Sequence, residues 1–126
     1  MMSWGDLLVE KDVPPIWEER IILRQLGGRV DLWIFAQAWR TRRMDVTFTA
    51  MFPELWETQQ EIFEALAVEV GAALDWSLNV RVESKVDYPT GPTSSCVRKL
   101  ILQVGEGHQL EGPINLLVRF KERWEA

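Results

Sequence analysis

Alternation of apolar and polar residues is the strongest pattern in the chain. Successive side chains of a strand point to opposite faces, so a period of two predicts a strand. Five segments alternate in this way and are expected to be strands: residues 29–40, 44–52, 77–88, 96–104 and 114–124. The turn between the first two is short, which predicts that they form an antiparallel hairpin.

A second pattern, with a period of three to four residues, begins at Pro53. Proline suits the first turn of a helix, and apolar residues then recur at helical spacing as far as Leu74. Four acidic residues form a stripe on the opposite side: Glu54, Glu57, Glu61 and Glu64. This segment is predicted to be a long amphipathic helix.

Residues 16–26 admit two interpretations. A preceding proline, acids in the first turn and Gly27-Gly28 at the end are typical of a helix. The β-branched pair Ile21-Ile22 favours a strand instead, with the two glycines as a hairpin turn into the next strand. We expect a short N-terminal helix here, with the strand as the alternative.

Together these elements predict an α+β fold. After the N-terminal segment the order is β-β-α-β-β-β, which suggests a largely antiparallel, five-stranded curved sheet with the long helix packed on one face. A chain of 126 residues fits one domain. We therefore expect a single domain over residues 1–126, in which residues 1–14 form a loosely ordered arm.

The compartment is inferred from cysteine usage and from the absence of long apolar runs. The single cysteine, Cys96, cannot form an internal disulfide, so nothing indicates an oxidising compartment. No apolar run reaches the length of a membrane span. The first ten residues lack the basic and apolar regions of a signal peptide. We expect a soluble protein of the cytoplasm that does not bind membranes.

Acidic residues are concentrated in one part of the chain. The net charge is −5, which argues against general binding of nucleic acid. Residues 54–75 hold six acids and no base, whereas the rest of the chain is close to neutral. The molecule is therefore expected to have one acidic side.

The chain is poor in groups that carry out chemistry. One histidine and one cysteine cannot form a zinc site, and we expect neither a metal nor a cofactor. Cys96 and His108 lie near opposite ends of one predicted strand, so a nucleophile–base pair is not expected. Gly105-Glu106-Gly107 leads into a predicted strand rather than a helix, and Glu106 would repel phosphate. No residue is assigned a catalytic role, which favours a protein that is not an enzyme.

The sheet face turned away from the long helix is expected to be both basic and apolar. Arginine and tryptophan anchor interfaces, and monomers seldom expose a large patch of this kind. The sequence leaves three alternatives for what packs on this face: the N-terminal segment, a second copy in a two-fold dimer, or a foreign acidic protein or organic anion. The candidate interaction surface consists of Arg81, Lys99, Arg119 and Lys121, together with Trp33, Phe35 and Trp39 if the aliphatic face of the hairpin packs on the helix.

The leading hypothesis is a non-enzymatic accessory or interaction protein that acts as a homodimer. The alternative is a small-molecule-binding protein or minor enzyme with a pocket between sheet and helix. A solid core at that place would argue against the alternative. The residues expected to line the pocket are aromatic: Trp33, Phe35, Trp56, Phe63 and Tyr88.

Overall fold

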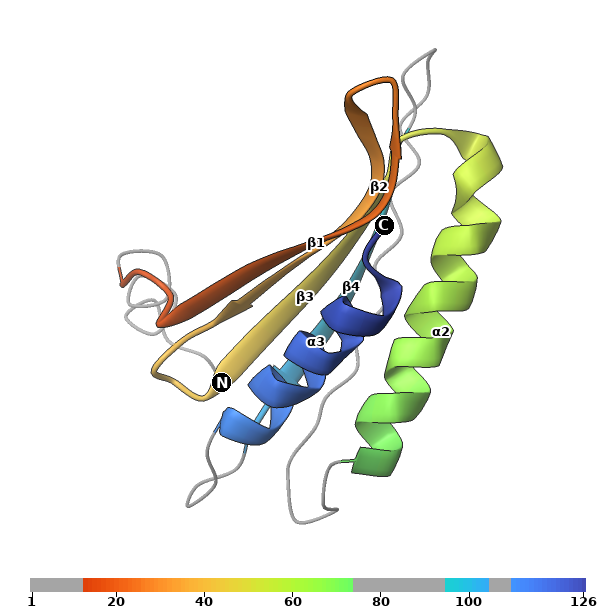
Figure 1. Ribbon diagram of the computed structural model, residues 1–126. Coiled ribbons are helices and arrows are strands. Elements are labelled where there is room, and N and C mark those ends of the chain that lie inside the picture. The colour runs from red at the N-terminus through yellow and green to blue at the C-terminus, as the bar shows by residue number, and fades with distance from the viewer. Residues whose placement is uncertain (1–12, 74–94, 105–109) are drawn as a thin grey trace.

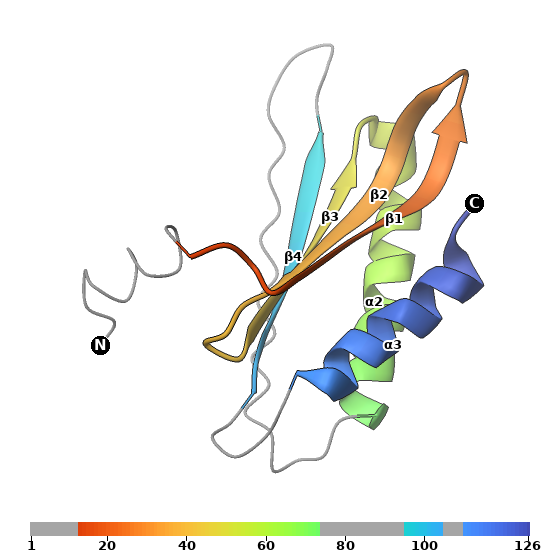
Figure 2. The same cartoon turned by 60° about the vertical axis from the view of Figure 1, so that its left-hand side comes forward.

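The protein is an α+β structure in which two helices pack on one face of an antiparallel sheet (Figures 1 and 2). The computed structural model describes residues 13–73, 95–104 and 110–126. Within these residues the sheet has four strands in the order β1-β2-β3-β4. Its elements are β1 (Trp17–Leu26), β2 (Arg29–Ala38), β3 (Arg43–Ala50), η1 (Pro53–Leu55), α2 (Trp56–Ala73), β4 (Cys96–Gln103) and α3 (Glu111–Trp124).

The expected N-terminal helix is wrong, because this segment forms strand β1 and pairs with β2 along its whole length. The turn between the two strands has φ of 59° at Gly27 and 78° at Gly28. A two-residue turn with positive φ at both positions matches the twist of an antiparallel hairpin, and glycine adopts it without strain. Ile21 then lies opposite Ile34, which places a β-branched pair in the buried layer.

The predicted hairpin of residues 29–40 and 44–52 is confirmed as β2 and β3, which pair antiparallel. The apolar positions that share one side of each strand are fully buried and face the helices: Leu32, Ile34, Ala36 and Ala38 in β2, and Met44, Val46, Phe48 and Ala50 in β3. The predicted strand at residues 96–104 is confirmed as β4, which pairs with β3.

The predicted strand at residues 114–124 is wrong, since this segment lies within helix α3. Its buried side chains are Pro113, Leu116, Leu117 and Phe120, a spacing of three, one and three residues that traces one face of a helix. Val118, which the alternation placed inward, is 37% exposed. Lys121 and Arg123 in the last turn favour the helix because they complement its negative end.

One predicted strand, at residues 77–88, and most of the expected N-terminal arm lie outside the described residues. The described sheet therefore contains three of the five predicted strands together with β1. The long helix predicted from Pro53 is confirmed, with a short 3-10 turn, η1, leading into α2. None of the described helices is long and apolar enough to cross a membrane.

The core lies between the sheet and the two helices. Phe63 of α2 meets Phe48 of β3 edge to face, with ring centroids 5.3 Å apart. Leu66 and Val70 continue the same face of α2 and are almost fully buried, as is Phe120 of α3. Each such side chain contributes roughly 1.5–3 kcal/mol before the entropy cost of ordering it, so both helices are held firmly against one face.

Candidate functional site

The other face of the sheet carries neither α2 nor α3, as Figure 2 shows. We call it the open sheet face. Residues that lie opposite one another in an antiparallel register have side chains on the same face, so the strand pairing identifies its members. They are Glu18, Arg20 and Ile22 of β1, Trp33, Phe35 and Gln37 of β2, Asp45, Thr47 and Thr49 of β3, and Val97, Lys99 and Ile101 of β4.

Apolar side chains of the open sheet face come from several strands. One row across the sheet runs Ile22, Trp33, Thr49, Val97, in the order of the strands. All four residues are half-buried, and so is Phe35 in the next row. The alternation along β1, β2 and β4 thus places apolar side chains on both faces of the sheet, some in the core and some on the open sheet face.

The charges of the open sheet face largely neutralise one another. Asp45 accepts hydrogen bonds from Arg43, with Nε at 2.8 Å, and its second oxygen lies 3.1 Å from Nζ of Lys99. The Asp45 residue is only 6% exposed, so this is a compact ionic cluster rather than a solvated pair. At the β1 side, Gln37 donates a hydrogen bond to Glu18 at 3.1 Å.

The residues of the candidate interaction surface predicted from the sequence do not all lie on one face of the structure. Trp33, Phe35 and Lys99 lie together on the open sheet face, and Trp39 follows directly after β2 in the turn to β3. Arg119 and Lys121 belong to α3 and therefore lie on the other side of the sheet (Figure 2). Arg81 is outside the described residues. The basic contribution that was expected from a last strand is absent from the open sheet face because that segment is a helix.

The aromatic residues of the alternative pocket are also separated. Trp56 and Phe63 lie on α2, whereas Trp33 and Phe35 lie on the opposite face of the sheet. Phe63 is 8% exposed and packs on Phe48, so the layer between helix and sheet is filled there. Tyr88 is outside the described residues.

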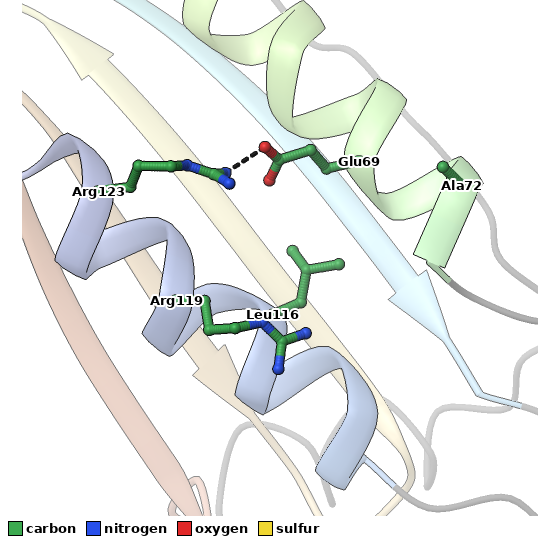
Figure 3. A pocket seen from close by; sticks show the side chains of 5 residues that line it. All are labelled: Glu69, Ala72, Leu116, Arg119 and Arg123. Carbon is green, nitrogen blue, oxygen red and sulfur yellow. Dashed lines mark hydrogen bonds and ion pairs between the residues drawn. The ribbon is translucent and has the colours of Figure 1, made fainter.

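A cleft that the sequence did not indicate lies between α2 and α3 (Figure 3). It has a volume of about 310 Å³ and is lined by Glu69, Ala72, Leu116, Arg119 and Arg123. Arg123 reaches across it to form an ion pair with Glu69, while the Arg119 guanidinium extends beside the apolar Leu116. The cleft could only be found once residues 111–124 were known to form a helix beside α2.

Metal-binding and nucleophilic groups are scarce in the part of the chain that the structure describes. No group of three His, Cys, Asp or Glu side chains there could hold a metal ion. The Cys96 thiol is buried on the helix-facing side of β4, away from any solvent-borne substrate. His108 lies outside the described residues.

Comparison of the chain with family models, with curated proteins and with solved structures found no match in any of the three.

Proposed function

We propose that this protein is a non-enzymatic interaction protein that forms a homodimer through its open sheet face. The observation that carries the proposal is the set of apolar side chains on a sheet face to which neither helix packs. Antiparallel sheets can leave one face to water, but such a face normally carries polar side chains. Trp33 and Phe35 at its centre are of the type that anchors interfaces.

The distribution of charge favours a second copy as the partner. The outer side of α2 carries several glutamates and no base, so two copies would repel one another there. The paired residues of the open sheet face named above, together with Arg43 beside Asp45, include two acids, Glu18 and Asp45, and three bases, Arg20, Arg43 and Lys99. A nearly balanced, partly apolar face permits two identical molecules of net charge −5 to approach through that side.

The test is the mass of the protein in solution, measured by sedimentation velocity over a range of concentrations. We expect a dimer for the natural protein and a monomer for Phe35→Glu, because a carboxylate would be buried without a partner at the centre of the interface. Val68→Glu is the matched control, since Val68 is an apolar residue of α2 that is 70% exposed, and it should stay dimeric.

A natural protein that is monomeric at all concentrations would overturn the proposal. If Phe35→Glu fails to fold, as judged by circular dichroism, Thr47→Arg tests the same face. Thr47 lies beside Phe35 in the register and is half-buried. A large charged side chain at this position should separate the dimer without removing any core contact.

The alternative function, binding of a small molecule, would have to use a different place from the one expected. The aromatic residues on the two sides of the sheet share no cavity among the described residues. The cleft between α2 and α3 offers Arg119 and Leu116 to a small organic anion, but it is shared with the Arg123–Glu69 ion pair. The open sheet face therefore supports the dimer better than the cleft supports a ligand.

A further inference from the structure

Strand β1 lies at an edge of the described sheet. Among the described residues it pairs only with β2, so no described strand occupies the backbone groups on its outer side. In the part of the chain that the structure describes, the outer side is occupied at one residue, Ile22. Its N–H and its C=O both point away from β2 and both are hydrogen bonded to the C-terminal residues of the chain.

The occupant is the dipeptide Glu125-Ala126. Helix α3 ends at Trp124, and Glu125 takes an extended conformation with φ −65° and ψ 133°. The N–H of Ala126 donates to the carbonyl oxygen of Ile22 at 2.9 Å. The N–H of Ile22 donates to the Oε2 atom of Glu125 at 3.1 Å. The carboxylate of Glu125 thus takes the place that a backbone carbonyl would have in an added strand.

Lys121 explains why the side chain that accepts from the Ile22 N–H is a carboxylate. Nζ of Lys121, one turn earlier in α3, lies 3.8 Å from the Oε1 atom of Glu125 and 2.5 Å from Oε1 of Glu19 on β1. An acceptor that bonds to Ile22 is therefore held beside a positive charge. A carboxylate satisfies both the N–H and the ammonium group, and hydrogen bonds with charged partners are the stronger ones.

Beyond Ile22, no described segment pairs with the outer side of β1. In the described residues, no backbone hydrogen bond from outside the β1–β2 ladder reaches residues 17–21. On the other side of Ile22 the register shifts between Ile22 and Arg24, the irregularity of a β-bulge, which limits pairing in that direction. An added segment would therefore extend from Ile22 towards Trp17.

We propose that the outer edge of β1 is a docking site for an extended, acidic peptide segment of a partner protein, and that Glu125-Ala126 occupies its acidic subsite in cis. The partner adds a strand along residues 17–22 and places a Glu or Asp side chain between the Ile22 N–H and Lys121. Addition of a strand to a sheet edge is a common mode of peptide recognition, in which main-chain bonds supply affinity and one side chain supplies specificity. The tail competes as an intramolecular ligand, so the intact protein binds such peptides weakly.

Two substitutions open the site without touching the core. Ala126→Pro removes the N–H that donates to Ile22, and Glu125→Ala removes the carboxylate. Glu122→Ala is the matched control, because Glu122 is an exposed glutamate on the same helix. The probes are two acetylated and amidated hexapeptides, TVTEAT and its neutral counterpart TVTQAT.

The expected result is that TVTEAT binds the Glu125→Ala, Ala126→Pro double variant at least tenfold more tightly than the natural protein or Glu122→Ala. It should shift the amide resonance of Ile22, and TVTQAT should bind the double variant at least threefold more weakly. Hydrogen exchange at the Ile22 amide should be at least tenfold faster in the unliganded double variant. A smaller gain in affinity, or amide shifts confined to residues away from β1, would overturn the proposal.

A second copy is the other conceivable occupant of the edge, and the same experiment distinguishes it. Self-association of the double variant that excludes TVTEAT would overturn the peptide proposal. The test is independent of the proposed homodimer, because the open sheet face and the strand edge use different groups. Repeating the titration in the Phe35→Glu background should leave peptide affinity unchanged.

Discussion

Nε of Arg98 donates a hydrogen bond to Oε1 of Gln59 at 3.0 Å, in the layer between β4 and α2. The amide nitrogen of Gln59 donates in turn to the backbone carbonyls of Phe48 at 3.0 Å and Cys96 at 2.8 Å. Gln59 is fully buried and Arg98 is 9% exposed. One side-chain amide therefore links the helix to two neighbouring strands and fixes its own orientation by bonding at both ends.

Replacing Gln59 by Leu should lower the free energy of unfolding by about 2–4 kcal/mol, because several buried polar groups would lose their partner at once. Urea denaturation measures the change. Gln60→Leu is the control: Gln60 is the exposed neighbour on the same helix, and its substitution should stay within about 0.5 kcal/mol of the natural protein. Equal stability of the two variants would show that the buried amide contributes nothing.

The ion pair between Lys121 and Glu19 predicts a loss of stability at high pH. The hydrogen bond to Glu19 raises the pKa of Lys121 above its ordinary value, and partial burial opposes this more weakly. A lysine whose pKa is raised on folding stabilises the folded state fully below the pKa of the unfolded chain, which is about 10.4. That contribution is lost as the pH rises through the higher pKa of the folded state.

The measurement is the difference in unfolding free energy between the natural protein and Lys121→Met at a series of pH values. We expect a constant difference from pH 8 to pH 9.5, followed by a decline from pH 10 to pH 12. Glu19→Gln should abolish most of that decline, since it removes the main cause of the shift in the pKa of Lys121. A difference that does not vary with pH would contradict the ion pair.

The β1–β2 turn can be tested by substituting its first glycine. Gly27 has φ of 59°, and no atom lies within 4 Å of the place where a Cβ would be. Gly27→Ala should therefore cost about 1–2 kcal/mol through backbone strain alone, without any clash. Gly27→Asn should recover much of this loss, because asparagine tolerates the left-handed region.

Gly71 is the control for Gly27, because the same substitution by alanine should stabilise the protein there. It lies in α2 with open space around it and no positive φ. Gly71→Ala should stabilise the protein by about 0.5–1 kcal/mol, since alanine loses less conformational freedom in a helix. Both variants can be followed by thermal unfolding, and an increase in stability for Gly27→Ala would rule out the positive-φ turn.

The most regular patterns in the sequence determined the central elements. In β2 and β3 the alternation is long and has aliphatic residues on one side, so only a strand buries that side. The apolar residues of α2 recur at helical spacing over several turns, and no strand could place them on one face. The alternation also separated an aliphatic side of β2 from an aromatic side, but it left open which of the two sides faces the helix.

Tertiary contacts decided the structure of two other described segments, residues 17–26 and 114–124. Residues 17–26 satisfy both helical and strand signals, and pairing with β2 through the glycine turn selects the strand. Residues 114–124 alternate, but Leu116, Leu117 and Phe120 are also spaced for a helix. A short apolar run fits both periods, and packing against α2 and β1 is what selects the helix.

The candidate interaction surface shows what local periodicity can and cannot predict. The sequence by itself determined that Trp33 and Phe35 share one side of their strand, because the side-chain period of a strand is fixed by covalent geometry. Lys99 joins them on one face only because β4 pairs with β3 and β3 with β2. Only the tertiary structure decided that Arg119 and Lys121 lie on the other side of the sheet, and that Glu125 and Ala126 reach the edge of β1. Such placements depend on contacts between segments far apart in the chain, and local periodicity carries no information about them.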